Sequence, residues 1–418
     1  MKHIVTDVAV IGGGAAGLTA ANSCRKKGWD VIVLEREENP GGVLLQCIHN
    51  GFGIHYFGEE LTGPEYAGKL LAEAEKLGVK IASNATVMKM EELLPEKHLL
   101  TVYSGKEGVL KVEAKSVILA MGCRERARGN LGIPGSRPAG IFSAGTAQKM
   151  LNSDGILPGR EAVIVGSGDI GLIMARRLSW CGIKVKAVIE IMPYPAGLSR
   201  NIAQCLEDFS IPLYLGSTVT AIHGKTRVEG VSFSPLSDGK PDLEKEEFIP
   251  CDTLLFSVGL VPENELSREY GIKLNPVTGG AFVNGEFMTS RKGVFSCGNV
   301  LHVHDLVDFV SMEAQEAAES VNEFLLGKIS SSHDLEVESS GNLRYIIPNS
   351  FSAGKKRRFT MRAKTPMDKG RLKVFCNGEL LAEKSFRYVK PAEMIAFELP
   401  GEVTSSLPAG SRITFTME

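Results

Sequence analysis

Three glycines near the start of the chain have the spacing of a phosphate-binding turn. In "DVAVIGGGAAGLTAA", Gly12, Gly14 and Gly17 form GxGxxG between an apolar run that predicts a strand and a pattern that predicts a helix. The first glycine permits a tight turn, the second lets the backbone approach a pyrophosphate, and the third lets helix pack on strand. The helix N-terminus then attracts the phosphates. The chemistry expected here is the binding of a dinucleotide.

An acidic residue follows at the distance that such a site requires. Residues 31–34 are apolar or β-branched and predict the next strand, and Glu35 comes directly after them. A carboxylate in that place accepts a hydrogen bond from a ribose hydroxyl. GxGxxG alone is a weak signal, but strand, glycine turn, helix, strand and acid in succession are specific. A glycine turn with only a structural role is the alternative.

The whole pattern recurs in "EAVIVGSGDIGLIMARRLSWCGIKVKAVIEI". Gly166, Gly168 and Gly171 form the second GxGxxG, and Glu190 ends the following strand. The alternative here is a βαβ unit whose nucleotide site has decayed. Two dinucleotide sites in one chain suggest a relay, in which a nicotinamide passes a hydride to a second redox cofactor.

The second acid also bears on which nicotinamide nucleotide binds. A carboxylate at Glu190 repels a 2′-phosphate, which favours NADH over NADPH. Arg200 could instead meet a 2′-phosphate, but it lies outside the usual position for that contact.

With both fingerprints in view, the chain resembles the two-dinucleotide-binding-domain flavoproteins, the pyridine nucleotide–disulfide oxidoreductase superfamily. The resemblance covers roughly residues 5–328. It rests on "VIGGGAAG" with the later Gly41-Gly42 pair, on "VILAMGCRER", on the second fingerprint, on "DTLLFSVGLVPENEL" and on "GVFSCGNV". It implies that the first fingerprint binds FAD and the second binds NAD(P)H, and that the late glycine motif contacts the flavin ribityl chain and phosphates.

The fingerprints and the resemblance together give two sets of predicted cofactor contacts. For FAD they are Gly12, Gly14, Ala15, Ala16, Gly17, Glu35, Arg36, Gly42, Val43, Ala120, Gly122, Gly298 and Asn299. For NADH they are Gly166, Gly168, Asp169, Ile170, Gly171, Glu190 and Gly259.

Two features depart from that family. Its late-motif aspartate is Asn299 here, which can bond a ribityl hydroxyl without a charge. Its redox cysteine pair has no counterpart, because the eight cysteines are scattered and none belongs to a CxxC motif. Disulfide reduction is therefore not expected. The scattered cysteines instead predict reduced thiols in a cytoplasmic setting. Cys47 in "NPGGVLLQCIHNGFG" could form a transient flavin adduct, but a small wall of the flavin pocket is the preferred interpretation.

A narrower resemblance is carried by "GGVLLQCIHNGFGIHYFGEELTGPEYA" and "CGNVLHVHDLVDFVS". These segments look like the FAD oxidoreductases encoded beside glycerol-3-phosphate dehydrogenase-like flavoproteins in anaerobic bacteria. They are also similar to the FAD subunits of opine oxidase and hydrogen cyanide synthase. The resemblance implies an NADH-linked electron-transfer partner of a second dehydrogenase.

The histidines offer candidates for proton transfer and for metal binding. His302, His304 and Asp305 ("HVHD") could share a face of an extended segment, but without supporting ligands we expect no metal and a polar lining beside the flavin. By resemblance, the helix that follows directs its N-terminus at the flavin pyrimidine ring. An acceptor that needs a proton could take one from a histidine, and the candidate catalytic residues are Cys47, His49 and His304.

The predicted fold class is α/β, with two Rossmann-like domains and a C-terminal all-β domain. By resemblance the NAD domain is inserted in a discontinuous FAD domain, and a helix is predicted near residues 64–77. "KISSSHD", residues 328–334, has the composition of a linker, and beyond it short alternating runs flank an Asn377-Gly378 turn, a strong hairpin signal. The predicted domains are residues 1–125 and 250–328 (FAD), 126–249 (NAD(P)) and 335–418 (β-sandwich-like).

Bulk composition excludes several other classes of function. A net charge of −2 over 418 residues gives no footprint for nucleic acid, and no apolar run reaches the roughly 18 residues of a membrane span. The sequence thus predicts a cytoplasmic FAD-dependent NADH oxidoreductase that passes electrons to a partner flavoprotein, an iron–sulfur protein or a small acceptor, in a homo- or hetero-oligomer. The alternatives are an FAD subunit of an amine or opine dehydrogenase, and a non-catalytic flavin-binding scaffold.

Overall fold

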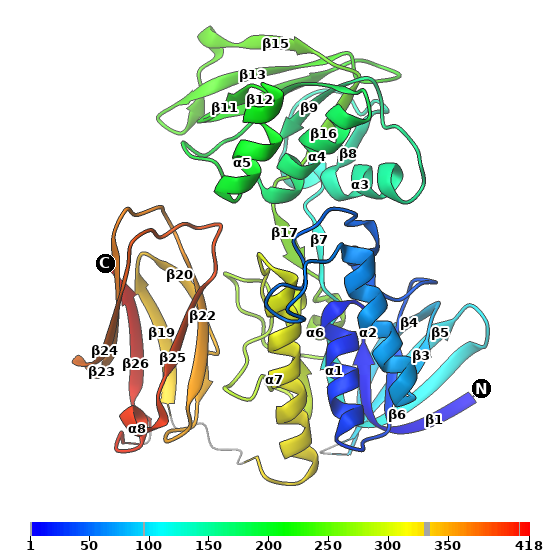
Figure 1. Ribbon diagram of the computed structural model, residues 1–418, viewed down its shortest axis with the longest axis vertical. Helices are drawn as coiled ribbons and strands as arrows, with labels where there is room; N and C mark the ends of the chain where they lie inside the picture. Colours follow the sequence, from blue (N-terminus) through cyan, green and yellow to red (C-terminus); the bar gives the residue numbers. More distant parts are fainter. Residues whose placement is uncertain (1, 95–96, 330–334, 409) are drawn as a thin grey trace. The chain divides into compact units, whose positions relative to one another are not determined.

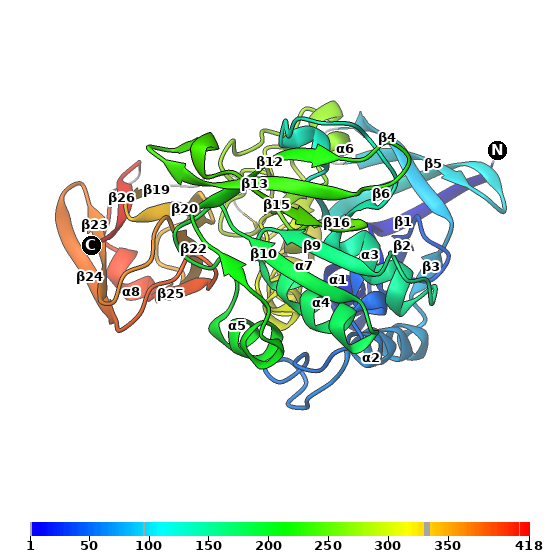
Figure 2. The same ribbon diagram turned by 90° about the horizontal axis from the view of Figure 1, so that it is seen from above.

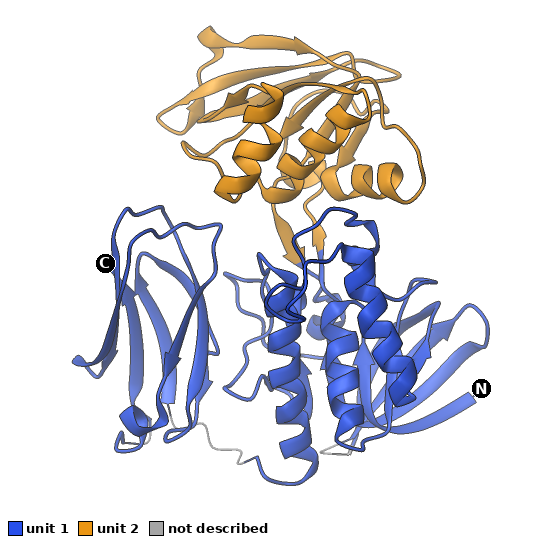
Figure 3. Cartoon of the chain, viewed as in Figure 1, with its two compact units in different colours: residues 1–123, 262–418 blue, residues 124–261 orange. Residues whose placement is uncertain are grey.

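The computed structural model describes residues 2–94, 97–329, 335–408 and 410–418. The chain divides into two compact units, Met1–Cys123 with Pro262–Glu418, and Arg124–Val261 (Figure 3). Within the described ranges, no helix is long and apolar enough to cross a membrane.

The first unit is built around a mostly parallel sheet whose centre is buried on both faces. Its strands lie in the order β3-β2-β1-β6-β5-β4, and β18 pairs with β6. Val8 and Val10 of β1 and Val117 of β6 are fully buried, as expected of a sheet with both faces covered. The strand bounds are β1 Lys2–Ile11, β2 Val31–Leu34, β3 Lys80–Ala82, β4 Ala85–Leu94, β5 Lys97–Ser104, β6 Gly108–Leu119 and β18 Val294–Ser296.

Three helices lie side by side in this unit, with α1 (Ala15–Lys26) between α2 (Gly63–Leu77) and α7 (Val307–Leu325) (Figure 1). The predicted helix near residues 64–77 is confirmed as α2. Thr62 and Glu65 form a capping box at its start and Gly78 ends it in the left-handed region, so local sequence sets both ends. A short helix, α6 (Glu265–Glu269), also belongs to this unit.

The second unit also has a parallel sheet, in the order β11-β10-β9-β16-β8. Ile164 and Leu255 of this sheet face helices, whereas Val163 and Leu254 face a small antiparallel sheet, so the two faces build separate cores (Figure 2). The parallel strands are β8 Ile141–Ser143, β9 Glu161–Val165, β10 Lys184–Ile189, β11 Leu213–Tyr214 and β16 Thr253–Phe256. The helices are α3 Ala144–Asn152, α4 Asp169–Trp180 and α5 Ser199–Cys205. The antiparallel strands are β12 Ser217–His223, β13 Gly230–Ser237, β14 Lys240–Pro241 and β15 Glu247–Pro250. Two short strands, β7 (Cys123–Glu125) and β17 (Leu260–Pro262), pair where the chain passes between the units.

Residues 335–418, the C-terminal β region, have a core of their own. A five-stranded sheet, β21-β19-β26-β23-β24, and a three-stranded sheet, β20-β22-β25, enclose Phe351, Phe359 and Phe415. Asn377 and Gly378 both have positive φ and join β23 to β24, as the hairpin signal predicts. The bounds are β19 Leu335–Gly341, β20 Leu343–Ile347, β21 Ser350–Phe351, β22 Arg357–Ala363, β23 Gly370–Cys376, β24 Glu379–Phe386, β25 Ile395–Leu399, α8 Gly401–Thr404 and β26 Arg412–Met417.

The predicted fold class is confirmed: two Rossmann-like regions and a C-terminal β region make up the chain. The segment predicted to be a linker falls largely on residues 330–334, which lie outside the described residues.

Candidate cofactor sites

The first fingerprint adopts the turn that a pyrophosphate site requires. Gly12 has φ +103°, and a Cβ there would lie 2.4 Å from the carbonyl oxygen of Ala120. At Gly17 a Cβ would lie 1.8 Å from the Gly12 carbonyl oxygen, so only glycine lets α1 pack on β1. For a Cβ placed at Gly14, the nearest described atom beyond its chain neighbours would be the Gly42 Cα, at 3.9 Å. The middle glycine therefore leaves open backbone, which fits a phosphate group at the N-terminus of α1.

Glu35 lies at the end of β2, beside this turn. One of its carboxylate oxygens, Oε2, accepts the backbone N–H of Gly13 at 2.6 Å, and Oε1 accepts that of Glu37 at 2.8 Å. The side chain is buried, and each carboxylate oxygen still has a second lone pair for a ribose hydroxyl. Of the neighbours predicted to contact FAD, Arg36 pairs with Glu37 and Val43 is exposed.

Segments far apart in the sequence converge on the N-terminus of α1. The backbone N–H of Gly41 donates to the Gly13 carbonyl oxygen at 2.8 Å, and a Cβ at Gly42 would lie 3.1 Å from the Gly14 Cα. A Cβ at Gly298 would lie 2.8 Å from the Ala16 Cβ. The glycine turn, the Gly41-Gly42 pair and the late motif thus lie together, as one dinucleotide site would require.

The loop that carries Cys47 follows a single turn of 3-10 helix, η1 (Gly42–Gln46), and is attached to α7. The backbone N–H of Gly53 donates to Asp308 Oδ1 at 3.0 Å. Cys47 Sγ donates to the Val43 carbonyl oxygen, and His49 Nδ1 lies 2.9 Å from the Asn50 carbonyl oxygen. Burial raises the pKa of Cys47 to about 12, so the thiol is protonated at neutral pH.

The late motif continues into a cluster of buried polar side chains. Asn299 Oδ1 accepts the backbone N–H of His304 at 3.0 Å, and Asn299 Nδ2 lies 3.6 Å from Cys123 Sγ. Glu313 of α7 accepts the backbone N–H of Gly298 at 2.7 Å through Oε1. Its other oxygen, Oε2, lies 2.7 Å from His302 Nε2 and 3.3 Å from His304 Nε2.

Glu313 carries its charge in a fully enclosed place. Burial by itself raises the pKa of Glu313, but the neighbouring His302 and His304 and their hydrogen bonds reverse that effect and hold the pKa well below its usual range. Burial lowers the pKa of His302. Sequence reasoning missed Glu313, although its position on the buried face of the helix after "HVHD" was a usable signal. Asp305 does not join His302 and His304 in contacting Glu313. Its Oδ2 instead accepts the backbone N–H of Met394.

The second fingerprint repeats the arrangement of the first. Gly166 has φ +93°, and a Cβ there would lie 2.1 Å from the Ser257 carbonyl oxygen. A Cβ at Gly171 would lie 2.7 Å from the Ser257 Cβ. Glu190 accepts the backbone N–H of Ser167 at 2.8 Å through Oε2 and that of Met192 at 2.9 Å through Oε1. Each acid therefore accepts one backbone N–H from the residue after the first glycine of its turn and one from two residues further along its own segment.

Other predicted NADH contacts surround this turn. Asp169 Oδ1 accepts from the Leu198 backbone and the Asn201 side chain, which ties the start of α4 to the start of α5. At Gly259, with φ +96°, no described atom beyond its chain neighbours would lie within 4 Å of a Cβ. Sequence reasoning did not find Ser257, whose hydroxyl accepts the backbone N–H of Gly171 at 3.0 Å.

The two acid-terminated glycine turns define a class of protein with two dinucleotide sites. The chain belongs to the pyridine nucleotide-disulphide oxidoreductase family, which matches residues 6–320. Members of this family bind FAD and NAD(P), and the chain is an FAD-dependent oxidoreductase.

Among curated proteins, the chain is similar to hydrogen cyanide synthase subunit HcnB of Pseudomonas protegens, with 26% identity over 329 residues. That match covers 74% of this chain and 67% of HcnB. An opine oxidase subunit of Rhizobium meliloti is 26% identical over 324 residues, which cover 70% of this chain and 58% of that protein. Thioredoxin reductase of Listeria monocytogenes is 27% identical over 301 residues, covering 71% and 86%.

Solved structures show the same fold. Thioredoxin reductase of T. acidophilum has a TM-score of 0.63 at 24% identity, covering 77% of this chain and 99% of that one. Lactococcus lactis thioredoxin reductase has a TM-score of 0.64 at 21% identity with the same coverage.

The packing of Gly17 makes a first prediction. Gly17→Ala should force α1 away from β1 and lower FAD affinity at least about tenfold, or ~1.4 kcal/mol, measured as FAD retained per chain after dialysis. Gly68→Ala in α2 is the control, because a Cβ there meets nothing within 4 Å. Full FAD retention in Gly17→Ala would contradict the assigned site.

The raised pKa of Cys47 gives a second prediction, about the reactivity of its thiol. A thiol with a pKa of about 12 has roughly a thousandfold less thiolate at pH 8 than a free cysteine. Iodoacetamide should therefore label Cys47 far more slowly than glutathione, and the rate should rise about tenfold per pH unit from pH 8 to 10. Peptide mass spectrometry measures the rate, with Cys47→Ser to identify the peptide. A rate that levels off near pH 8 would contradict the prediction.

Proposed function

We propose that the chain is a cytoplasmic NADH oxidoreductase that uses FAD to pass electrons to a partner protein, without a redox-active disulfide. The observation that carries the proposal is the repeated acid-terminated glycine turn, with Glu35 at the first site and Glu190 at the second. One site holds each nucleotide, and the late motif at Gly298 and Asn299 completes the first.

The residues of the chain position and enclose the reactants. When bound, FAD and NADH supply the hydride-transfer chemistry, which needs no side-chain acid. Glu35 and Asn299 hold ribose and ribityl hydroxyls, while Glu190 holds the nicotinamide nucleotide and disfavours a 2′-phosphate. Cys47 forms part of the wall of the flavin pocket, which agrees with its high pKa.

The partner protein is supported by how several relatives are named. HcnB and the opine oxidase relative are both named as subunits of larger enzymes, and so is PreT of Escherichia coli, which belongs to NAD-dependent dihydropyrimidine dehydrogenase. PreT is 25% identical over 335 residues, covering 77% of this chain and 69% of that protein. We infer that this chain likewise exchanges electrons with a second protein of such a complex.

A second candidate function is the FAD subunit of an amine or opine dehydrogenase, in which an organic substrate reduces the flavin. Two opine oxidase subunits, from Rhizobium meliloti and Agrobacterium tumefaciens, support it, each 26% identical to this chain. The two functions differ in the reductant that the protein accepts.

Anaerobic reduction of the flavin-loaded chain separates these functions. We expect NADH to bleach the flavin absorbance within seconds, NADPH to do so at least about tenfold less efficiently, and a secondary amine to leave it unchanged. Bleaching by the amine and not by NADH would establish the second candidate. If no reductant bleaches the flavin and the chain co-purifies with a partner, the chain is a non-catalytic flavin-binding scaffold.

Glu190→Gln tests the nucleotide preference itself. Loss of a charged acceptor to a ribose hydroxyl costs about 1.5–3 kcal/mol, so KM for NADH should rise at least about tenfold while KM for NADPH changes less. Glu161→Gln is the matched control, because Glu161 begins β9 and pairs with Lys186. An unchanged ratio of the two KM values would contradict the role of Glu190.

A further inference from the structure

We propose that His302, His304 and Glu313 bind a divalent transition-metal ion of the zinc class. The cluster adjoins the late motif of the first cofactor site, but metal binding there takes no part in hydride transfer and does not depend on the proposed function. The sequence predicts no metal here because "HVHD" has no supporting ligand, and Glu313 of α7 is the ligand that sequence alone did not reveal.

The three side chains converge on one point, well away from solvent. One ligand atom from each lies within 4.8 Å of the other two. The side chains of His302, His304 and Glu313 are 0%, 2% and 7% exposed. Two imidazoles and a carboxylate are a recurrent set of protein ligands for Zn²⁺.

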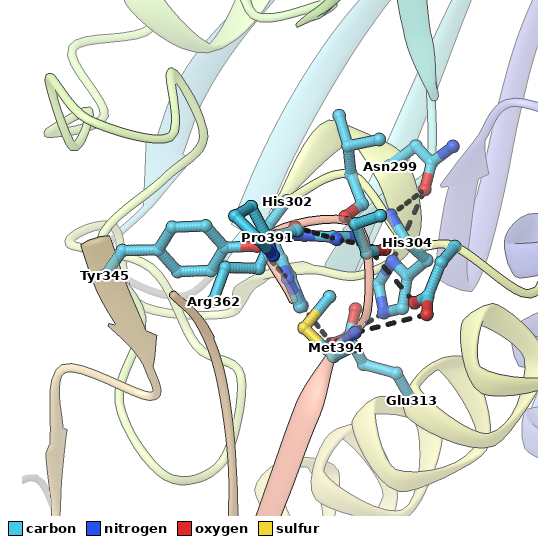
Figure 4. Close-up of polar contacts among 11 residues, drawn as sticks. Asn299, His302, His304, Glu313, Tyr345, Arg362, Pro391 and Met394 are labelled. Atoms are coloured by element: carbon cyan, nitrogen blue, oxygen red, sulfur yellow. Dashed lines mark hydrogen bonds and ion pairs between the residues drawn. The ribbon is translucent and has the colours of Figure 1, made fainter. Parts of the chain in front are cut away.

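The remaining polar atoms of the three side chains already have partners of the kind seen around metal sites. His302 Nδ1 lies 3.4 Å from the Tyr345 hydroxyl, and His304 Nδ1 lies 3.3 Å from Asn299 Oδ1. Glu313 Oε1 accepts the backbone N–H of Gly298. A metal-bound histidine typically donates its other ring N–H to such an acceptor, which fixes the ring. Both Nε2 atoms and Oε2 are left to face one another (Figure 4).

This orientation sets up an electrostatic conflict that a cation resolves. An amide oxygen only accepts, so His304 must donate from Nδ1 to interact favourably with Asn299 Oδ1. Its Nε2 lone pair then faces Glu313 Oε2 at 3.3 Å. Two lone pairs at that distance repel unless a cation or a proton lies between them, and the convergence of His302 on the same oxygen favours a shared metal ion.

The distances from Glu313 Oε2 to the two histidines suit a small ion after a limited adjustment. With bonds of about 2.0–2.1 Å, the ligands of a tetrahedral ion lie about 3.4 Å apart. His304 and Glu313 already have nearly that separation, and His302 Nε2 would move about 0.7 Å outward from Oε2. A cavity of about 50 Å³ adjoins the cluster; its lining is largely apolar and includes His304, Glu313, Glu316 and Arg358. It has room for a water molecule as the fourth ligand.

Zinc binding to the flavin-loaded 418-residue chain tests the proposal. After treatment with a chelator, the protein should take up one Zn²⁺ per chain in competition with a chromophoric chelator. X-ray absorption of the zinc-loaded protein should show nitrogen and oxygen ligands near 2.0–2.1 Å, without the sulfur near 2.3 Å that a cysteine site would give.

Variants connect the bound ion to these residues. His302→Gln and His304→Gln should each weaken Zn²⁺ binding at least about tenfold, and Tyr345→Phe, which alters only the partner of His302, about tenfold. His223→Gln is the matched control, because His223 lies in the second unit and contacts Ser232. Flavin content and circular dichroism would show that each variant is folded.

Failure would take one of two forms. If Zn²⁺ does not bind stoichiometrically, a proton holds the cluster together and the proposal is overturned. If Zn²⁺ binds equally well to His302→Gln and His304→Gln, the ion lies elsewhere and the proposal is equally wrong. Neither result alters whether NADH bleaches the flavin, so the two proposals fail independently.

Discussion

One hydrogen bond organises the late part of the first cofactor site, that between the backbone N–H of Gly298 and the carboxylate of Glu313. Gly298 packs so closely on Ala16 that its position also fixes the late motif against the N-terminus of α1. A buried carboxylate is tolerated only when its oxygens are matched by donors or cations. Here the backbone N–H of Gly298 meets that condition for Oε1, and a cation or a proton between Oε2 and the two histidines meets it for Oε2. Glu313 on α7 thereby fixes Gly298 and, with it, the adjacent Asn299.

The two glycine turns are stabilised by hydrogen bonds of the same kind. In each, an acid at the end of a strand accepts one backbone N–H from the turn and a second from two residues further along its own segment. The same carboxylate that a ribose would contact therefore also stiffens the turn itself. This arrangement reduces the ordering cost that a flexible loop would add to binding.

Sequence predicted those parts of the sites that are encoded locally. The spacing of the glycines and the acid within one βαβ unit predicts how they are arranged, because the turn, the helix and the strand are set by neighbours in the chain. The same holds for the helix predicted near residues 64–77, which is α2, and for the hairpin at Asn377-Gly378. Glu313, Ser257 and the bond from Gly53 to Asp308 were not predicted, because their partners come from distant segments. A periodic pattern shows that a residue of α7 is buried but not which backbone group it meets.

The C-terminal β region lies beyond residues 6–320, the part of the chain that matches the family, and it also contacts the segment that follows the late motif. Arg362 of β22 donates to the Val303 carbonyl oxygen at 3.0 Å, and Tyr345 of β20 lies against His302. Arg362 also donates to the carbonyl oxygens of Pro391 and Ala392, so its guanidinium joins the histidine segment to the β region through several bonds at once. A planar group with five donors is suited to that task, whereas a lysine would offer a single point of attachment. The segment that follows the late motif is therefore held from two sides, by α7 through Glu313 and by the β region through Arg362.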